Sequence, residues 1–227
     1  AAKGSGMICP NMATMLAFFT TDAAIEKAAL KRAFKESVTD SFNRISVDGD
    51  MSTNDSAIVF ANGMAGNKIV KKGSADYSRF SNALKFISGE LAKKIVLDGE
   101  GARRFVEIKV SGAKTKGHAE KIARHIADSS LIKTMIAGGD PNWGRVAASV
   151  GSSGVGIKQS KLSIYFGNKL VMKNGAAVNV SRKALLGIFK KKEIEVTVDL
   201  ASGSSSSKVW TCDLTEEYVR INSRYET

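Results

Sequence analysis

Two long segments of the chain carry apolar residues at the spacing of an amphipathic helix. The first runs from residue 25 to 42, and Asp22 precedes it as a suitable N-cap. The second runs from residue 77 to 95. In both segments apolar residues recur three or four positions apart, so one face of each helix is apolar. The sequence therefore predicts two helices that pack through these faces against a core.

Short apolar segments elsewhere are typical of strands. Residues 106–110 alternate apolar and polar side chains, as a strand with one buried face does. The other expected strands are residues 45–47, 57–61, 162–166, 170–172, 194–200 and 209–212, with residues 202–207 as a surface link. Further helices are expected at residues 120–127, after Arg145, at 181–189, and beyond an Asp213 cap. This interleaving predicts an α/β or α+β fold of mixed sheets layered with helices, with a domain boundary near residue 112.

The segment from Lys3 to Phe19 combines a Gly-rich start, a restricted turn and an apolar end. Pro10 fixes its own φ and biases the residue before it toward extended conformations. The turn leads through the small Ala13 to Thr14, and the apolar run that follows is expected to be buried. Taken alone, this pattern leaves two interpretations open. Thr14 is either an ordinary β-branched strand residue or a reactive residue presented by a stiff turn.

Three other polar stretches are candidates for binding. Residues 48–55 form a loop dense in carboxylates and amides, but its spacing does not fit a calcium-binding loop. Glu100 stands between two glycines after the second helix, where it either holds an amine or belongs to a capping turn. Residues 137–145 form a Gly-rich turn before a helix, which either binds an anion through backbone N–H groups or only starts that helix.

The composition is that of a globular protein with a basic balance. The 227 residues carry a net charge of +12, with 43% hydrophobic and 25% charged residues. Lys and Arg are scattered and aromatic residues are few, which favours a basic face for acidic small molecules or an acidic partner chain over a nucleic-acid-binding module. No apolar run approaches the ~20 residues that span a bilayer. A cytoplasmic protein without membrane contact is expected.

The few cysteines and histidines do not indicate a cofactor site. Cys9 and Cys212 lie far apart without metal-ligand spacing, and neither His118 nor His125 has a triad partner near it in the sequence. No metal or other cofactor is therefore expected. The chain begins with Ala1 rather than methionine, which indicates that an original start has been removed.

Five stretches, in order along the chain, resemble the ornithine acetyltransferase family, the bifunctional glutamate N-acetyltransferases of arginine biosynthesis. They are KGSGMICPNMATMLAF, ISVDGDMSTNDS, DGEGARRFVEI, IAGGDPNWGR and TCDLTEEYVRINSRYET. Met51 and Ser56 stand where threonines are expected in the family, and Cys9 where a small residue is expected. The resemblance runs from one end of the chain to the other.

The resemblance implies that a precursor cuts itself between Ala13 and Thr14. Residues 1–13 are then the tail of an α chain, residues 14–112 the nucleophile domain of a β chain, and residues 113–227 a second, smaller α/β domain. The resemblance also implies an architecture like that of N-terminal-nucleophile enzymes, with Thr14 as the nucleophile. The implied substrate-binding residues, matched one by one, are Lys3, Thr14, Glu100, Asn222 and Thr227.

The implied reaction is a ping-pong transfer of acetyl from N-acetylornithine, through Thr14, to glutamate. An α-amine has an ordinary pKa of about 7.7 to 8.0, so after cleavage it can act as the base for the hydroxyl of the same residue. The family's oxyanion hole is a Thr-Gly pair of the α chain, and each missing donor costs roughly 10²- to 10³-fold in rate. The implied partners are the α chain, in an α2β2 or larger assembly, and the two substrates. Whether acetyl-CoA is also a donor stays open.

Two rival interpretations use the same observations. An N-terminal-nucleophile amidase or aminopeptidase would employ the same Thr14 but pass the acyl group to water. A basic nucleic-acid-binding module would instead bind DNA or RNA in a salt-sensitive way.

Overall fold

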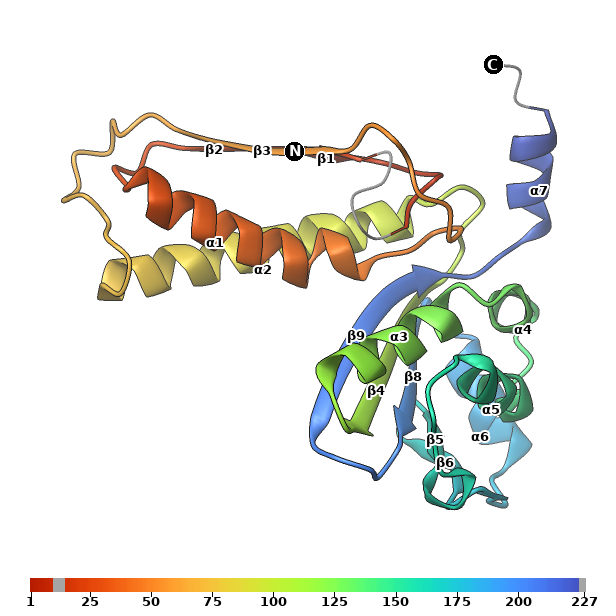
Figure 1. Cartoon of the computed structure of the whole chain (residues 1–227). Helices are drawn as coiled ribbons and strands as arrows, with labels where there is room; N and C mark the ends of the chain where they lie inside the picture. The colour runs from red at the N-terminus through yellow and green to blue at the C-terminus, as the bar shows by residue number, and fades with distance from the viewer. Residues whose placement is uncertain (10–14, 225–227) are drawn as a thin grey trace. The chain divides into compact units, whose positions relative to one another are not determined.

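Contacts within the chain define two compact units, Ala1–Asp98 and Gly99–Thr227, and each is described by itself. The computed structural model describes residues 1–9 and 15–224 (Figure 1). The boundary expected near residue 112 falls inside strand β4 (Phe105–Ala113), which pairs with two other strands of the second unit. An interior strand belongs with the strands it pairs to, so the contacts divide the chain before β4.

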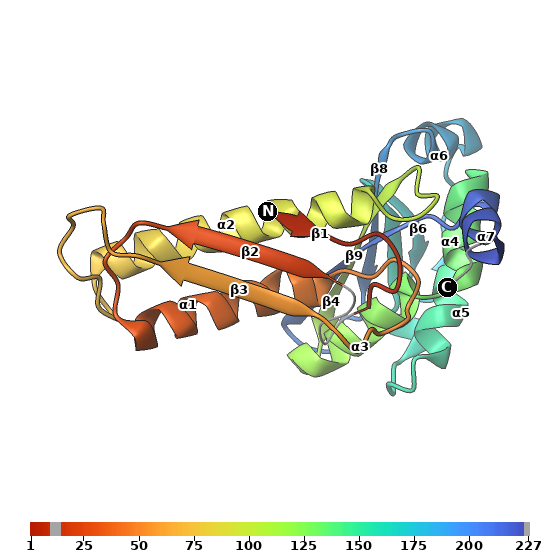
Figure 2. The same cartoon turned by 90° about the horizontal axis from the view of Figure 1, so that it is seen from above.

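The first unit is a three-stranded sheet with two long helices on one face. Its strands β1 (Ala2–Lys3), β2 (Leu16–Thr21) and β3 (Ser56–Ala61) lie in that order, with β2 and β3 parallel. Helices α1 (Lys27–Asp40) and α2 (Ala75–Leu97) run along the same face of this sheet (Figures 1 and 2). Phe19 of β2 points into this interface, where its ring packs edge-on against Phe34 and Phe42 at centroid distances of 5.5 and 6.2 Å.

The opposite face of the same sheet is apolar and exposed. Successive side chains of a strand point to opposite faces, so Ala17 and Phe19 are buried while Leu16 and Phe18 are not. Ile58 of β3 lies beside Phe18 in register, and Phe60 follows two positions on along the same face; Phe18 and Phe60 are 44% and 57% exposed. The expectation that the apolar run after Thr14 is buried is therefore right for one face of β2 only.

Long-range pairing sets the beginning of α1. Ile25 pairs with Val70, and the Glu26 N–H donates to the Val70 carbonyl at 3.1 Å, so the helix starts at Lys27 with Glu26 as its N-cap. The N-cap expected at Asp22 is wrong for this reason. The second helix begins at Ala75, close to the predicted start. Ser74 is its N-cap, and the Ser74 Oγ accepts the Tyr77 N–H at 3.1 Å.

Residues 45–47 do not form the expected strand. A single turn of 3-10 helix, η1 (Phe42–Arg44), precedes them. The Val47 N–H then donates to the Ile8 carbonyl at 2.7 Å, which ties this stretch to the beginning of the chain.

The second unit is a six-stranded mixed sheet in the order β7-β6-β5-β8-β4-β9. β4 runs parallel to β8 (Glu193–Asp199) and antiparallel to β9 (Ser205–Cys212). The remaining strands are β5 (Ser163–Phe166), β6 (Lys169–Lys173) and β7 (Ala176–Ala177), preceded by a 3-10 turn, η2 (Gln159–Lys161). The expected strands are confirmed, but residues 205–207 belong to β9 and not to a surface link.

Helices α3 (Lys116–Ala127), α4 (Ser130–Gly138), α5 (Trp143–Ser152) and α6 (Arg182–Phe189) share one hydrophobic core with this sheet. Val106, Ile108 and Val110 are fully buried in that core. The side chains between them on β4 face the other way, where the Trp210 indole N–H donates to Glu107 at 2.7 Å. α3, α5 and α6 follow the predicted patterns, whereas α4 was not anticipated.

The last helix, α7 (Glu216–Ser223), begins behind Thr215 and not behind Asp213. Asp213 is buried, and its carboxylate accepts the backbone N–H groups of Arg103 and Arg104. The cap expected at Asp213 is therefore wrong, because this side chain binds a distant segment instead. The predicted mixed α/β fold is confirmed. Among the described residues, the helices are all too short or too polar to cross a membrane.

Candidate active site

Glu100 and Asn222, two residues expected in the site, are hydrogen-bonded to each other. The Asn222 side-chain amide donates to Glu100 Oε2 at 2.8 Å and to the Tyr218 carbonyl at 3.0 Å. The two residues lie 122 positions apart in the sequence, and both belong to the second unit. The second bond orients the Asn222 amide on α7, so that its other N–H meets the carboxylate.

A glycine beside Glu100 allows α7 to approach this closely. Gly101 has a φ of +69°, and a Cβ on it would lie 2.5 Å from the Tyr218 nitrogen. Thr215, the N-cap of α7, donates its hydroxyl to the Gly101 carbonyl at 2.7 Å. The turn that carries Glu100 and the helix that carries Asn222 are thus in direct contact, and only glycine fits that contact without strain.

Two buried polar side chains fix the segment that leads into α7. The Asp213 carboxylate accepts from the Arg103 and Arg104 N–H groups at 2.8 and 2.9 Å. Lys133 of α4, only 3% exposed, donates through Nζ to Thr211 Oγ1 at 3.0 Å and to the Cys212 carbonyl. A buried ammonium group is tolerated because acceptors surround it. These residues position the Glu100–Asn222 pair; the sequence marked Asp213 only as a helix cap and did not mark Lys133.

Lys3 lies in the first unit at the edge of a basic cavity. It is exposed on β1 opposite Leu16, and it lines a cavity of about 380 Å³ together with Ser5, Lys94 and Asp98. Two ammonium groups against one carboxylate leave the cavity with an excess of positive charge. Such a cavity is suited to an anionic group such as a carboxylate.

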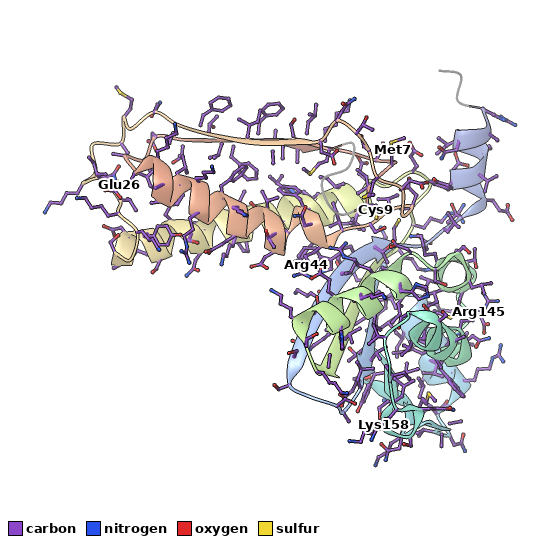
Figure 3. All side chains as sticks on the ribbon, in the orientation of Figure 1. Met7, Cys9, Glu26, Arg44, Arg145 and Lys158 are labelled. Carbon is purple, nitrogen blue, oxygen red and sulfur yellow. The ribbon has the colours of Figure 1, made fainter. Side chains whose placement is uncertain are left out.

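The acidic loop of residues 48–55 binds the backbone on both sides of residues 10–14. Asp48 accepts the N–H groups of Met7 and Ile8 at 2.6 and 3.0 Å, and Figure 3 shows Met7 where the chain approaches this loop. Met7 has a φ of +52°, a strained conformation for a residue with a side chain. On the other side Asp55 Oδ1 accepts the Met15 N–H at 2.6 Å. The sequence marked this loop as polar but gave it no role.

Burial raises the pKa of Asp55 from 3.8 to about 6, and the hydrogen bond from the Met15 N–H opposes that rise. Asp55 Oδ2 is buried and has no hydrogen-bond partner among the described residues. Thr14 and Thr227, and with them the bond between Ala13 and Thr14, lie outside the described residues. The structure thus brings Glu100 and Asn222 together in the second unit and shows Lys3 lining a cavity of the first unit.

The Gly-rich stretch of residues 137–145 connects two helices. Gly139, at a φ of +69°, ends α4, and Asn142 precedes α5 as its N-cap. Arg145 donates to the Leu131 carbonyl at 2.7 Å and so fastens α5 to α4. Its side chain lies beside a wide cavity that also contains His125, whose Nε2 is 2.9 Å from Ser152 Oγ. Of the two interpretations of this stretch, these contacts favour the helix-start turn.

Together these features define a mixed α/β protein with a carboxylate–amide pair in the second unit and a basic cavity in the first. The ArgJ family model matches residues 1–227, so the chain belongs to the ArgJ family, as its five sequence stretches predicted.

Curated relatives match over the whole of this chain. The "Arginine biosynthesis bifunctional protein ArgJ" of Symbiobacterium thermophilum is 46% identical over 226 residues, and that of Caldanaerobacter subterraneus is 47% identical over 230 residues. The match covers 100% of this chain but only 56% and 57% of those two proteins, so the chain spans a little over half of their length. The crystal structure of the Bacillus halodurans protein of the same name has a TM-score of 0.90 and 38% identity, covering 93% of this chain and 100% of that chain.

Proposed function

We propose that this chain is part of a self-cleaving acetyltransferase of arginine biosynthesis, which moves acetyl from N-acetylornithine to glutamate. The observation that carries the proposal is the contact between Glu100 and Asn222, two positions that match the family's substrate-binding residues. The names of the relatives, all arginine biosynthesis bifunctional proteins, support the same assignment. Amino-acid biosynthesis takes place in the cytoplasm, and the enzyme is expected there.

Cleavage begins with attack of the Thr14 hydroxyl oxygen on the Ala13 carbonyl carbon. The new C–O bond forms, the C–N bond breaks, and the hydroxyl proton passes to the departing nitrogen, which becomes the α-amine of Thr14. Water then hydrolyses the ester, which frees the Thr14 hydroxyl and leaves a carboxylate on Ala13. The small side chain of Ala13 leaves room for the attack, and backbone strain in the approaching segment favours it.

The fractions of the relatives' lengths that match this chain support cleavage. Curated relatives are matched over only 55–58% of their length, whereas the crystallised Bacillus halodurans chain is matched over 100% of its length by 93% of this chain. That polypeptide is thus much shorter than the curated proteins of the same name. Residues 14–227 make up nearly the same share of this chain as the 93% that the crystallised chain matches. This agreement is expected if the crystallised chain begins near the cleavage position.

Acetyl transfer then proceeds in two half-reactions through Thr14. The Thr14 oxygen takes the acetyl group of N-acetylornithine, and ornithine leaves with the hydroxyl proton on its freed amine. The amine of glutamate next attacks the acetyl-threonine ester, and its proton returns to the Thr14 oxygen as N-acetylglutamate leaves. The α-amine of Thr14 relays these protons.

Charge complementarity gives the other site residues their proposed roles. Glu100 binds the substrate ammonium, Lys3 binds its carboxylate, and Asn222 and Thr227 orient both groups. The basic cavity beside Lys3 and the carboxylate–amide pair at Glu100 support this division.

The partner polypeptide is proposed to be the α chain of the same precursor, in an α2β2 or larger assembly. Large exposed apolar patches mark interaction surfaces, and the open sheet face that carries Leu16, Phe18, Ile58 and Phe60 is such a patch. Figure 3 shows side chains standing on this face, away from α1 and α2. The length by which the relatives exceed this chain is enough for a partner of similar size to cover it.

The test uses the complete polypeptide that contains this chain, and intact-mass analysis of the purified protein. The wild type is expected to give two polypeptides cut between Ala13 and Thr14, and Thr14→Ala is expected to stay uncut and to transfer no acetyl. If Thr14→Ala leaves both cleavage and transfer unchanged, the proposal is wrong.

Product analysis separates the rival functions. Acetyl from N-acetylornithine should reach glutamate, whereas an amidase or aminopeptidase would release acetate. Supplying acetyl-CoA as the only donor shows whether the enzyme uses it as well. Salt-sensitive retention on DNA or RNA would favour the nucleic-acid-binding alternative.

A further inference from the structure

A cavity of the second unit lies beside the segment that follows Glu100 and the beginning of α7. Its volume is about 480 Å³, and its walls come from that segment, from the second half of α4 and from α7. Arg103, Thr215 and Glu216 are among the residues that line it. The cavity is thus bounded by the same two elements that bring Glu100 and Asn222 together.

Two side chains of opposite charge line this cavity without pairing with each other. The backbone N–H of Arg103 donates to Asp213, but its guanidinium group forms no ion pair among the described residues. Glu216, in the first turn of α7, also has no ion pair within the described part of the chain, whereas its neighbour Glu217 binds Arg220 at 2.6 Å. A cation on one wall and an anion on another suit a ligand that carries both charges.

The rest of the lining narrows the chemical class of this ligand. Leu214 and Val219 supply apolar surface, and Val219 is 61% exposed. A free α-amino acid with an aliphatic side chain offers a carboxylate to Arg103, an ammonium group to Glu216 and an apolar group to this surface. Charge-assisted hydrogen bonds of about 2.8 Å at each end let such a ligand bridge two charged groups that are too far apart to pair. A polyphosphate would instead be repelled by Glu216.

A ligand of this kind would join the segment after Glu100 to α7. Thr215 already links the two elements, because its hydroxyl donates to the Gly101 carbonyl at 2.7 Å. Asn222 makes a second link further along α7, through its bond to Glu100. A ligand held by both charged walls adds a third link, which exists only while α7 lies against that segment. Binding therefore stabilises the arrangement in which Glu100 and Asn222 meet.

We infer that this cavity is a second binding site, which takes a free α-amino acid with an aliphatic side chain and holds α7 in place. The ligand's carboxylate binds Arg103, and its ammonium group binds Glu216. Binding does not depend on the proposed function, and only the comparison with acetyl transfer rests on it.

The first experiment is calorimetry on the complete polypeptide that contains this chain, with L-leucine as the probe. L-Leucine carries both charges and an aliphatic side chain but no acetyl group to donate. A dissociation constant of about 1 mM is expected for a few contacts at an exposed site. Isoamylamine, which lacks the carboxylate, and isocaproate, which lacks the amine, should each bind about tenfold more weakly or worse.

Two variants test the two walls of the cavity. Arg103→Gln and Glu216→Gln each remove one charge at an exposed position, and each should raise the dissociation constant about tenfold. Glu217→Gln is the matched control, because Glu217 is the next residue of α7 and does not line the cavity. It should bind L-leucine as the wild type does. An equal loss of affinity in all three variants would overturn the inference.

Hydrogen exchange measures the effect on α7. At ten times its dissociation constant, a ligand that binds only the docked arrangement should slow exchange of the α7 amides about tenfold. The amides of α1, in the first unit, serve as the internal control and should be unaffected. Exchange of α7 at the same rate with and without L-leucine would overturn the inference, as would the absence of binding.

Kinetics separate this site from the candidate active site. At the same concentration, L-leucine should leave KM for N-acetylornithine within about twofold, whereas competition at one site would raise it about tenfold. A tenfold rise would therefore overturn the inference. A protein that binds L-leucine through Arg103 and Glu216 but transfers no acetyl would contradict the proposed function and support this binding site.

Discussion

The two units hold their parts of the candidate site in different ways. In the second unit Glu100 and Asn222 meet directly, and the buried side chains of Asp213 and Lys133 fix the elements that carry them. In the first unit, carboxylates of the acidic loop accept hydrogen bonds from the backbone on either side of residues 10–14. The second unit thus joins distant segments around one carboxylate–amide pair, whereas in the first unit a single loop binds the backbone at two points.

The cores of the two units differ in a related way. In the second unit one continuous cluster of buried residues joins the sheet to four helices. In the first unit the helices cover one face of the sheet, and the other face exposes aromatic and aliphatic side chains. The second unit thus buries its hydrophobic surface in one core, whereas the first unit leaves an apolar sheet face exposed, which supports the proposed binding of another polypeptide there.

The largest effect on acetyl transfer is expected from a substitution of Gly101, where the second unit has no room for a side chain. Gly101→Ala would place a Cβ 2.5 Å from the Tyr218 nitrogen at a φ of +69°, and α7 must move away. We expect kcat/KM for acetyl transfer to fall by about 10²-fold or more, because Asn222 moves with α7. The free energy of unfolding should fall by about 1–3 kcal/mol.

Gly138→Ala serves as the matched control for this variant. Gly138 is the last helical residue of α4, before its C-cap Gly139, and a Cβ on it would meet nothing within 4 Å, so an alanine there should leave transfer and stability nearly unchanged. Wild-type kcat/KM in Gly101→Ala would show that the contact between the Glu100 turn and α7 does not support the site.

Removing the charge of Glu100 should have the next largest effect. Glu100→Gln keeps an oxygen for the Asn222 amide but no longer attracts an ammonium group. KM for N-acetylornithine is expected to rise about 10- to 100-fold, as for loss of one charge-assisted hydrogen bond, while cleavage remains complete. Glu90→Gln, which affects only a surface pair with Lys93 on α2, should leave KM unchanged. Equal KM values in the two variants would exclude Glu100 from substrate binding.

The spacing of apolar residues within a segment predicted the helices and strands correctly where that segment alone determines its structure. The helices at 27–40 and 75–97 and the alternation along β4 follow from apolar spacing. The predictions were wrong where a contact with a distant segment determines the local structure. Ile25 is held by Val70 instead of starting a helix, and Asp213 binds two backbone N–H groups more than 100 residues earlier instead of capping α7.

The candidate site shows the same division. Glu100 was noticed because glycines flank it, and Asn222 was assigned only through the family resemblance. The part played by Asp55 could not be read from the sequence, because it depends on the parallel register of β2 and β3. Nor could the open sheet face be read, because an apolar strand looks the same whether one face or both are covered.

A smaller effect is expected on the open face of the first unit. Phe60→Ser removes a 57% exposed ring that contributes nothing to the helix-covered core. Burying such a ring contributes about 1.5–3 kcal/mol, so the affinity between the two cleaved polypeptides should fall about tenfold or more. Re-association after separation in mild denaturant measures this. Met64→Ser, at a position 79% exposed outside the sheet, should have no effect. Equal affinities would show that the partner binds elsewhere.

The smallest effect concerns Asp55 and the pH dependence of stability. It is best measured in Thr14→Ala protein, in which no α-amine is created. Burial raises the pKa of Asp55 in the folded state to about 6, above its unfolded value of 3.8, and the Met15 N–H only partly offsets this. The folded state therefore holds this proton more tightly than the unfolded state. The stabilisation that protonation gives is fully present below pH 3.8 and is lost as the pH rises through 6.

Asp55→Asn removes this titration but keeps the oxygen that accepts the Met15 N–H. In the Thr14→Ala background the variant should be more stable than its parent at pH 7, and the difference should vanish toward pH 4. Urea midpoints of both proteins at the two pH values give the comparison. A variant that is equally destabilised at both pH values would mean that Asp55 serves the fold of the first unit alone.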